Sequence, residues 1–418
     1  MSYTISKSDR NIKGTIKLDG SKSISNRVLI IRALCGEDFE IENLSTSDDS
    51  KAMLKALQQA QGTAATIDVG AAGTTMRFLT AYLSNKSGEW ILTGSERMKQ
   101  RPIAVLVDAL RTLGADIEYL ENDGYPPLKV IGKKMEGGKV EINAGVSSQY
   151  LSALLMIAPV LQKGLKLQLK GDLVSKPYLT MTLNIMNNFE VQSKWLNDQT
   201  IFVASQSYQA KPFFVESDWS AASYHYALAA FGEEVDLSLE GLLAESLQGD
   251  SVLPEMMQAF GVETVYGDKV VHLTKKKSEL TSFEYDFVEC PDIAQTLAVV
   301  CGGLKVEGIF SGLVTLSIKE TDRTAALQEE LAKFGISFQQ KQADEWVLTF
   351  SENSASSPSN IEELIEVKTY HDHRMAMAFA PLAMVRSAFK IENPMVVTKS
   401  YPVFWEDLKT LGFSLNNP

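Results

Sequence analysis

An internal repetition constrains the fold of this chain more than any other feature of its sequence. A short alternating strand, a turn rich in Gly, Ser or Asp, and a largely apolar helix follow one another six times. Strands that alternate with helices in this way form parallel βαβ units, so the pattern predicts an α/β fold. The copies cover Ile16–Cys35, Ile67–Leu83, Val140–Leu161, Phe213–Phe231, Phe287–Cys301 and Val367–Met384.

A second, more amphipathic helix follows each copy, and most of these helices end at a Gly, as helix C-termini often do. Two alternating strands often come next, for example Asp116–Leu120 with Leu128–Ile131. The repeat of about 50–80 residues is longer than most solenoid units. The expected second helices are Asp48–Gln61, Ile103–Leu113, Lys176–Phe189, Ser251–Phe260, Lys319–Phe334 and Pro402–Leu411.

The length of the chain predicts two domains. At 418 residues it exceeds the range of about 250–300 residues at which a single hydrophobic core stops growing. The six copies divide into three for each domain. We expect residues 1–14 and 217–418 to form one domain and residues 15–216 to form the other.

The composition indicates a cytoplasmic protein without nucleic-acid or membrane partners. The net charge of −12 disfavours non-specific binding to nucleic acids or anionic membranes, which requires a basic surface. No apolar run approaches the about 20 residues of a membrane-spanning helix, and the polar start Met1–Lys13 predicts no signal peptide. The three cysteines lie far apart in apolar surroundings, so we expect reduced thiols, and four histidines are too few for a zinc site.

The first helix start, Gly20–Arg27, has the residues of an anion site. The first N–H groups of a helix have no partner inside it, and the helix dipole favours negative charge there. Lys22 and Arg27 add positive charge, and three serines add hydroxyl donors. The Gly-x4-Gly-Lys spacing of a nucleotide-hydrolase phosphate loop is absent. The simpler alternative is an N-capped surface helix with two incidental cations.

Other helix starts carry comparable side chains, notably Ala72–Arg77, Val146–Tyr150 and His371–Met375. A ligand set with more than one phosphate plus carboxylates would suit so many cations in an acidic protein. Two acidic residues, Asp292 and Glu320, lie in the same set of turns and helix starts and are candidates for general base and general acid. The simpler alternatives are that Asp292 is a plain helix cap and that Lys319–Glu320 is a solvated helix start. The recurring cations are Lys22, Arg27, Arg101, Lys319, Arg323, Arg374 and Lys399.

Taken together, these motifs resemble those of the 5-enolpyruvylshikimate-3-phosphate synthase family, in order, from about residue 3 to 415. The resemblance implies transfer of the enolpyruvyl group of phosphoenolpyruvate to the 5-hydroxyl of shikimate 3-phosphate, a step towards chorismate and the aromatic amino acids. It also implies two similar domains of three βαβαββ repeats each, an inside-out α/β barrel, with the active site in the cleft between them. The motifs are Gly20–Arg27, Ala72–Arg77, Arg97–Ile103, Val146–Gln149, Gly171–Tyr178, Lys319–Arg323 and Asp372–Met377.

The resemblance also implies a role for each matching residue. Contacts to shikimate 3-phosphate are implied for Lys22, Ser23, Arg27, Ser147, Ser148, Gln149, Ser175, Tyr178, Asp292 and Lys319. Contacts to phosphoenolpyruvate are implied for Lys22, Gly73, Arg101, Gln149, Arg323, Arg374 and Lys399. The implied catalytic residues are Asp292 as proton acceptor, Glu320 as the acid that protonates the methylene carbon, and Lys22. No metal or organic cofactor is expected, because cations already neutralise the substrate charge. The internal pseudo-symmetry of the chain favours a monomer.

The sequence departs from the family pattern at a few positions. Many relatives carry Asn at the position of Ala71 and Pro at that of Phe78. Many also carry Asn and Arg at the positions of Thr315 and Ser317, where the hydroxyl of Thr315 could replace a contact to the shikimate moiety. We expect these changes to affect substrate affinity and leave the reaction class intact.

Three alternatives remain at this point. A UDP-N-acetylglucosamine enolpyruvyl transferase shares the fold, but its mobile loop usually carries a reactive cysteine, and the loop Ser95–Pro102 has none. A catalytically silent binding protein would be favoured if Lys22, Asp292 or Glu320 were replaced. A nucleic-acid-binding protein on a related repeat fold is disfavoured by the net charge.

Overall fold

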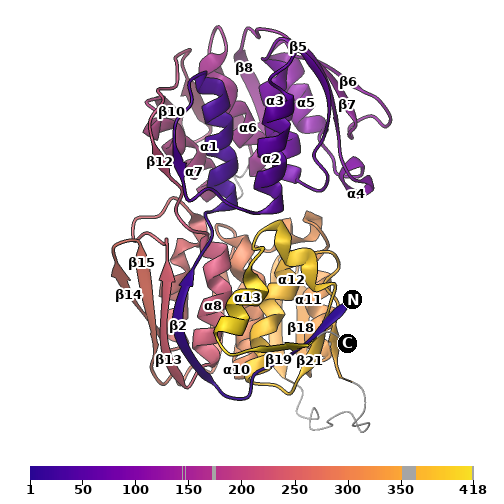
Figure 1. Cartoon of the computed structure of the whole chain (residues 1–418). Coiled ribbons are helices and arrows are strands. Elements are labelled where there is room, and N and C mark those ends of the chain that lie inside the picture. The colour runs from indigo at the N-terminus through magenta and orange to yellow at the C-terminus, as the bar shows by residue number, and fades with distance from the viewer. Residues whose placement is uncertain (144, 146, 172–175, 351–363, 417–418) are drawn as a thin grey trace. The chain divides into compact units, whose positions relative to one another are not determined.

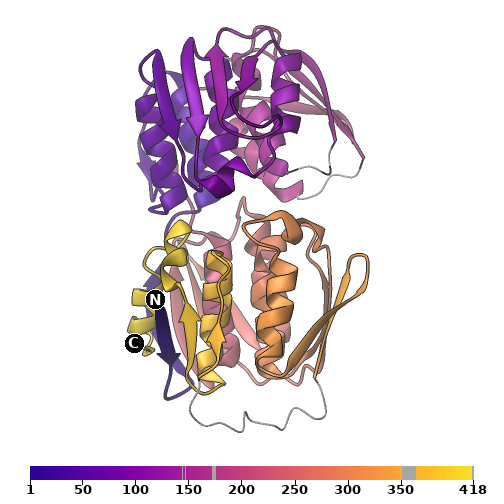
Figure 2. The same ribbon diagram turned by 90° about the vertical axis from the view of Figure 1, so that its right-hand side faces the viewer.

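The computed structural model describes residues 1–143, 145, 147–171, 176–350 and 364–416, which form two compact units (Figures 1 and 2). Unit 1 comprises Met1–Asp19 and Glu216–Pro418, and unit 2 comprises Gly20–Val215. Strand β2 (Asn11–Lys17) therefore belongs to unit 1 over its whole length. The first passage between the units thus lies later in the chain than the boundary after residue 14 that we expected.

The sheets of unit 2 follow one plan in two copies and a shortened plan in the third. In each four-stranded sheet the first pair is parallel and the other pairs are antiparallel. The strand orders are β4 (Ala64–Asp68), β5 (Gly88–Thr93), β7 (Leu128–Gly132), β6 (Asp116–Tyr119); β8 (Gly138–Asn143), β9 (Leu165–Lys170), β11 (Thr200–Val203), β10 (Ser193–Asn197); and the parallel pair β12 (Phe213–Phe214), β3 (Ile41–Glu42).

The sheets of unit 1 repeat the same plan of one parallel pair followed by two antiparallel pairs. The orders are β2, β13 (Glu234–Glu240), β15 (Val270–Lys275), β14 (Val262–Gly267); β16 (Ser282–Asp286), β17 (Glu307–Ser311), β19 (Glu345–Phe350), β18 (Ile336–Gln342); and β20 (Glu366–Val367), β21 (Phe389–Glu392), β1 (Ser2–Ser6), β22 (Ser414–Asn416). The N-terminal strand β1 completes the last sheet, so both ends of the described chain pair with each other there.

The two repeats that carry the passages between the units exchange their first strands. Strand β2 precedes a helix of unit 2 in the chain, yet it pairs in parallel with β13 of unit 1. Strand β12 precedes a helix of unit 1, yet it pairs in parallel with β3 of unit 2. The copies expected at Ile16–Cys35 and Phe213–Phe231 therefore each contribute a strand to one unit and a helix to the other.

The first helix of each repeat, called the inner helix below, lies in the interior of its unit. Helix α8 is buried at every residue, as expected of a helix that is apolar on all sides. Strands present one apolar face to these helices; in the pair β8–β9, for example, buried Val140 and Ile142 oppose Leu167 and Leu169. Figures 1 and 2 show the sheets on the outside of these helices. The inner helices are α1 (Lys22–Cys35), α3 (Gly73–Ser84), α6 (Ser148–Ile157), α8 (Trp219–Phe231), α10 (Ala294–Leu304) and α12 (His373–Phe379).

The expected second helices are also present and are more amphipathic. The helix expected from Lys319 begins only at Arg323, because Asp322 caps it by accepting a hydrogen bond from the backbone N–H of Ala325. These helices are α2 (Asp48–Gln59), α5 (Ala104–Thr112), α7 (Lys176–Asn188), α9 (Leu253–Ala259), α11 (Arg323–Ala332) and α13 (Phe404–Thr410); a short helix, α4 (Glu96–Lys99), precedes α5. The α/β organisation predicted from the repetition is confirmed.

Candidate functional site

In unit 1 the starts of the inner helices and the ends of nearby turns bring the predicted residues together. Asp292 lies on the 3-10 turn η3 (Pro291–Ile293), directly before α10. Lys319 and Glu320 lie between the turn η4 (Val314–Ile318) and α11, and Arg323 is the first residue of α11. The other members are Arg374 in the first turn of α12 and Lys399 at the end of the turn η6 (Pro394–Lys399).

Arg323 is the centre of this cluster and is only 2% exposed. Its Nε donates to Asp372 Oδ2 at 2.7 Å, its Nη1 to Asp292 Oδ1 at 3.0 Å, and its Nη2 to Glu320 Oε2 at 3.0 Å. Burial lowers the pKa of Arg323, but Asp372, Glu320 and Asp292 more than offset that effect, so its pKa is raised overall. A guanidinium with a carboxylate on each edge has a fixed orientation.

Asp292 bridges several cations and is not a helix cap. Besides Arg323, its Oδ2 lies 3.0 Å from Arg374 Nη2, and its Oδ1 lies 3.8 Å from Lys319 Nζ. Burial lowers the pKa of Lys319, while the charge of Asp292 opposes that shift. The oxygens of this carboxyl group are hydrogen-bond acceptors, and a carboxylate so placed can act as a general base towards a bound hydroxyl group.

Glu320 is held by two cations and remains partly exposed. Its Oε1 accepts from Lys399 Nζ at 2.7 Å, and its Oε2 accepts from Arg323 Nη2 at 3.0 Å. It lies before α11 and not on it, so the alternative of a solvated helix start is wrong.

The turn before α12 has an unusual backbone that places Asp372 and Arg374. Tyr370 and His371 are consecutive non-glycine residues with positive φ, 52° and 57°. Left-handed residues of this kind cost of order 1–2 kcal/mol each, so the surroundings must hold them. Asp372 follows, caps α12 by accepting from the N–H of Arg374 at 2.9 Å, and uses its other oxygen for Arg323.

In unit 2 the starts of the helices also gather at one end. Lys22 Nζ at the start of α1 lies 3.5 Å from Asp49 Oδ2 at the start of α2. Thr75 Oγ1 in the first turn of α3 donates to the carbonyl of Asp49, and Gln149 Nε2 at the start of α6 donates to Thr74 Oγ1 at 3.0 Å. Converging helix N-termini with a lysine among them form a favourable place for an anion.

Arg27 lies deeper than its expected role suggests, with 2% of its side chain exposed. Its guanidinium donates to Thr182 Oγ1, to the carbonyl of Ser23 and to Ser152 Oγ at 2.7, 2.8 and 3.0 Å. It also lies over the rings of Phe78 and Tyr178. Burial lowers the pKa of Arg27 to about 10, so it stays charged at neutral pH.

Gly73 and Arg101 are in direct contact. A Cβ atom added at Gly73 would lie 2.5 Å from Arg101 Nη1 and 2.5 Å from Arg77 Nη1. Only glycine therefore allows both arginines their present positions at the start of α3. Arg77 Nη1 in turn donates to the carbonyl of Gly73 at 2.9 Å.

The other predicted residues of unit 2 that the structure describes also lie at the starts of helices. Ser147 caps α6 by accepting from the N–H of Gln149, and Ser148 is the first residue of that helix. Tyr178 is in the first turn of α7, where its ring faces Arg27. Ser175 lies outside the described residues, so its predicted phosphate contact stays a prediction.

Two of the residues that depart from the family pattern, Phe78 and Ser317, have local contacts. Phe78 is fully buried and packs against the guanidinium of Arg27. The hydroxyl of Thr315 is buried and has no hydrogen-bond partner among the described residues, and Ser317 donates to the carbonyl of Val314. Nothing in the structure explains the alanine at position 71.

The sequence did not single out Asp49, Asp250 and Asp372, which are all bonded to candidate residues or their neighbours. Asp372 is the first residue of the motif Asp372–Met377, and its position directly before an apolar helix is typical of a helix cap. Asp250 accepts a hydrogen bond from Ser220 at the start of α8. Burial raises the pKa of Asp250 to about 7, the charge of Asp292 adds to that shift, and Arg374 opposes it.

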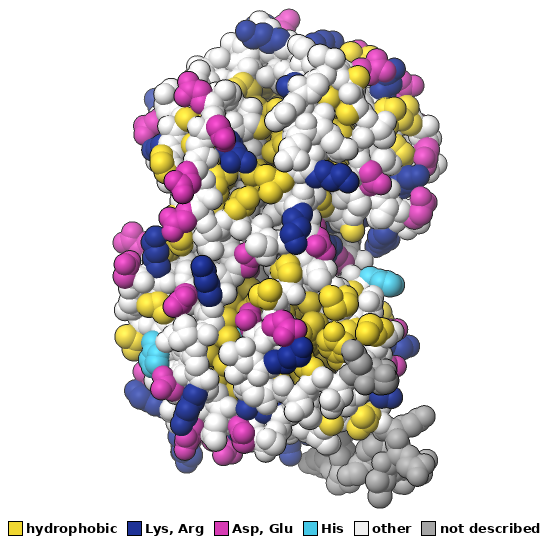
Figure 3. Space-filling model, viewed as in Figure 1, with side chains coloured by type: hydrophobic (Ala, Val, Ile, Leu, Met, Phe, Trp, Pro, Cys, Tyr) yellow, Lys and Arg dark blue, Asp and Glu magenta, His cyan; other side chains and the backbone are white. Residues whose placement is uncertain are grey.

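Four further properties concern possible membrane, metal and nucleic-acid partners: membrane-spanning helices, metal-ligand groups, free thiols and surface charge. Within the described residues, no helix is both long and apolar enough to cross a membrane, and no group of three or more His, Cys, Asp or Glu side chains is placed to hold a metal ion. Cys35, Cys290 and Cys301 are all free thiols. On the face shown in Figure 3, acidic and basic side chains of the described residues are interspersed.

Comparison with known proteins identifies relatives along nearly the whole chain. Residues 6–65 and 58–408 match the family model described as EPSP synthase (3-phosphoshikimate 1-carboxyvinyltransferase). A protein of that enzyme name from Bacteroides fragilis (strain YCH46) is 46% identical over 415 residues, 99% of each chain. One from Photobacterium damsela subsp. piscicida is 39% identical, covering 96% of this chain and 97% of its own.

The fold itself matches solved structures. A structure of EPSP synthase from Acinetobacter baumannii superposes with a TM-score of 0.79 and covers 100% of both chains, at 20% identity. At that identity the match supports the fold alone. It confirms the fold class that the resemblance implied.

Proposed function

We propose, because this chain belongs to the EPSP synthase family, that it transfers the enolpyruvyl group of phosphoenolpyruvate to the 5-hydroxyl of shikimate 3-phosphate and releases phosphate. This is the enolpyruvyl transfer of the shikimate pathway. The observation that carries the proposal is the cluster in unit 1, where Asp292 and Glu320 both contact Arg323 and each also contacts other cations. An acid, a base and several anion-binding groups thus stand together in one place.

The cations of the cluster are proposed to bind phosphoenolpyruvate. Arginine guanidinium groups match carboxylate and phosphate oxygens in pairs, and a lysine adds a point charge. In the present arrangement carboxylates occupy these cations, so the substrate must replace some of those contacts when it binds. The proposed contacts are Arg323, Arg374 and Lys399 in unit 1, and Lys22, Gly73, Arg101 and Gln149 in unit 2.

Shikimate 3-phosphate is proposed to use the helix starts of unit 2. The hydroxyl groups of Ser147 and Ser148 at the start of α6 suit a phosphate group there. Arg27 must exchange one of its present hydroxyl or carbonyl partners to contact the substrate. The other proposed contacts are Lys22, Ser23, Gln149, Ser175, Tyr178, Asp292 and Lys319.

The two carboxyl groups are proposed to move the protons. Asp292 takes the proton of the 5-hydroxyl, which lets the oxygen attack the second carbon of phosphoenolpyruvate. Glu320 gives a proton to the methylene carbon, so that a methyl group and a tetrahedral adduct form. Loss of a proton from that methyl group then expels phosphate and restores the double bond. The cations, including Lys22, offset the charge that develops on the adduct, and the scheme uses no metal or organic cofactor.

Phosphate release from phosphoenolpyruvate tests the proposal directly. The protein is supplied with shikimate 3-phosphate or with UDP-N-acetylglucosamine, in the presence of a chelator. Release only with shikimate 3-phosphate is the expected result. Release only with the nucleotide sugar would change the acceptor, and no release from the folded protein with either acceptor would favour a silent binding protein.

We also propose that the protein is a monomer in the cytoplasm and that it binds neither nucleic acid nor membranes. The net charge of −12 and the free thiols support it. Light scattering during gel filtration would contradict the monomer if the mass were a multiple of 46.0 kDa.

A further inference from the structure

A buried acid lies behind the cluster of unit 1, on the 3-10 turn η2 (Gly249–Val252), which follows a loop attached to the start of α8. The side chain of Gln248 accepts from the N–H of Trp219 at 3.0 Å and donates to the carbonyl of Ser217 at 2.8 Å. Glu216 accepts from the N–H of Leu247 at 2.8 Å. These bonds fix the loop that leads into Asp250, whose side chain is 5% exposed.

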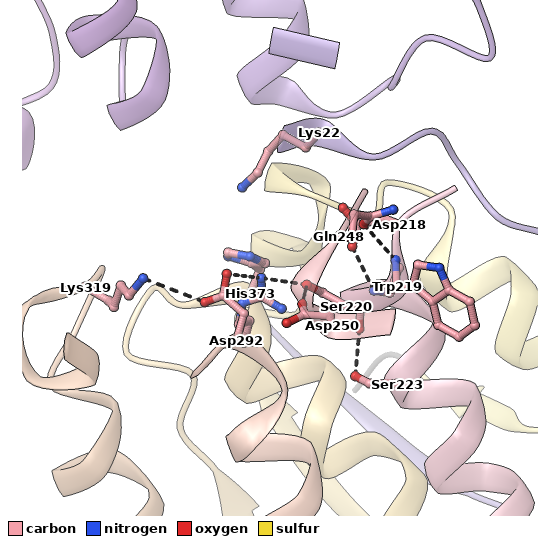
Figure 4. Close-up of polar contacts among 12 residues, drawn as sticks. Lys22, Asp218, Trp219, Ser220, Ser223, Gln248, Asp250, Asp292, Lys319 and His373 are labelled. Atoms are coloured by element: carbon pink, nitrogen blue, oxygen red, sulfur yellow. Dashed lines mark hydrogen bonds and ion pairs between the residues drawn. The ribbon is translucent and has the colours of Figure 1, made fainter. Parts of the chain in front are cut away.

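The attached loop brings Asp250 against Ser220, near Asp292 (Figure 4). Ser220 Oγ donates to Asp250 Oδ2 and accepts from Arg374 Nη2 at 3.3 Å. A hydroxyl group has one proton, so a bond to Asp250 leaves only its lone pairs for Arg374. Asp250 therefore sets the direction of the Ser220 hydroxyl.

The opposite end of the same guanidinium is held by the next turn of α8. Tyr224, four positions after Ser220 on the same helix face, accepts from Arg374 Nη1 at 3.3 Å. Arg374 Nη2 also contacts Asp292 Oδ2 at 3.0 Å. Helix α8 thus presents an oxygen atom to each terminal nitrogen of Arg374, and of these two oxygens only that of Ser220 is directed by Asp250.

We propose that Asp250 is a positioning residue for the enolpyruvyl transfer: through the hydroxyl of Ser220 it fixes the guanidinium of Arg374 in the orientation that receives phosphoenolpyruvate. The inference rests on the proposed function, because Arg374 is one of its phosphoenolpyruvate contacts. Asp250 itself touches neither substrate in this account.

Removal of the charge separates this role from a structural one. Burial of the carboxylate is unfavourable for folding, so Asp250→Asn should not lower the melting temperature at a pH of about 8. The same substitution should raise the KM for phosphoenolpyruvate about tenfold, as expected when a hydrogen bond to a charged group is weakened. The KM for shikimate 3-phosphate should rise much less than that for phosphoenolpyruvate, because Arg374 is not among its proposed contacts and is linked to that substrate only through Asp292.

Two further variants complete the experiment. Ser220→Ala should also raise the KM for phosphoenolpyruvate, and the double variant should be no worse than the more affected single variant, because both act along one path. Ser251→Ala is the control, since Ser251 donates to the carbonyl of Gln248 in the same loop and does not contact Ser220 in the bonds described. It should leave both KM values unchanged, whatever it does to the melting temperature.

Several results would overturn the inference and leave the proposed function standing. One is an unchanged or lower KM for phosphoenolpyruvate in Asp250→Asn. Another is a rise in both KM values together with a lower melting temperature, which would indicate general damage. A third is a double variant whose KM is raised by the product of the two single effects. A wild-type protein inactive with shikimate 3-phosphate would instead remove the proposed function.

Discussion

Substitution of Asp372 by Asn should destabilise unit 1 strongly, because it removes a fully buried charge from beside Arg323. Asp372 is 0% exposed and accepts from Arg323 Nε at 2.7 Å. Loss of one partner of a buried ion pair costs about 3–5 kcal/mol. Arg323 keeps Asp292 and Glu320, each at 3.0 Å, so the lower end of about 3 kcal/mol is expected.

The choice of asparagine keeps a second role of the side chain intact. The amide oxygen can still accept from the N–H of Arg374 and cap α12, so the measured loss reports the ion pair. For a folding unit of about 150–250 residues, each kcal/mol shifts the melting temperature by about 2–4 °C, which gives a fall of about 6–12 °C.

Denaturant unfolding and calorimetry would measure this effect, with the transitions of the two units fitted separately if they do not coincide. Asp322→Asn is the matched control, because Asp322 precedes the same arginine, is exposed, and also caps a helix. It should change the free energy of unfolding by less than about 0.5 kcal/mol. A loss of less than about 1 kcal/mol in Asp372→Asn, or equal losses in both variants, would refute the reasoning.

Three other substitutions have distinct expected outcomes. Glu320→Gln should reduce turnover severely, and it should lower the melting temperature less than Asp372→Asn does, because the Glu320 side chain is 17% exposed and that of Asp372 is 0% exposed; a larger loss of stability than in Asp372→Asn with near-normal turnover would make Glu320 structural. Gly73→Ala should raise the KM for phosphoenolpyruvate, because the new Cβ would lie 2.5 Å from Nη1 of both Arg101 and Arg77 and would displace the ends of these side chains; an unchanged KM would contradict this. Burial lowers the pKa of His225 to about 3, so the folded state resists a proton that the unfolded state binds below a pH of about 6.5. Wild type should therefore lose about 2 kcal/mol relative to His225→Gln between pH of about 7 and 5; parallel stability curves would contradict it.

The repetition in the sequence was sufficient to predict much of the architecture. Helices whose residues are apolar on all sides, such as α8, could be recognised as central, and their starts as the places where ligand-binding residues gather. The ion pairs that join Asp292, Arg323 and Arg374 show that helix starts distant in the chain do meet in unit 1.

The exchange of first strands could not be predicted in the same way. Alternating residues identify β2 and β12 as strands. Whether each of them pairs in parallel with β3 or with β13 depends on where the chain passes between the units. Local pattern does not contain that information.

The contacts of buried acids were equally hidden from the sequence. Asp250 lies on the turn η2, directly before the outer helix α9, and reaches the start of α8 because Gln248 and Glu216 hold the preceding loop there. Arg27 lies at an expected helix start, yet its guanidinium is buried because it donates hydrogen bonds to the hydroxyl groups of Ser152 and Thr182 on other helices. Both cases depend on tertiary contacts between segments far apart in the chain.

The central claim is that a proton is added to the methylene carbon and later removed from a methyl group. Turnover in D2O, with the product examined by mass spectrometry and proton NMR, tests it most directly. We expect deuterium at the enolpyruvyl methylene of the product, because a solvent-derived deuteron on that carbon competes with two hydrogens when the methyl group loses a proton. A product that carries only hydrogen there, formed at a normal rate, would contradict the addition and elimination and the role of Glu320 with it.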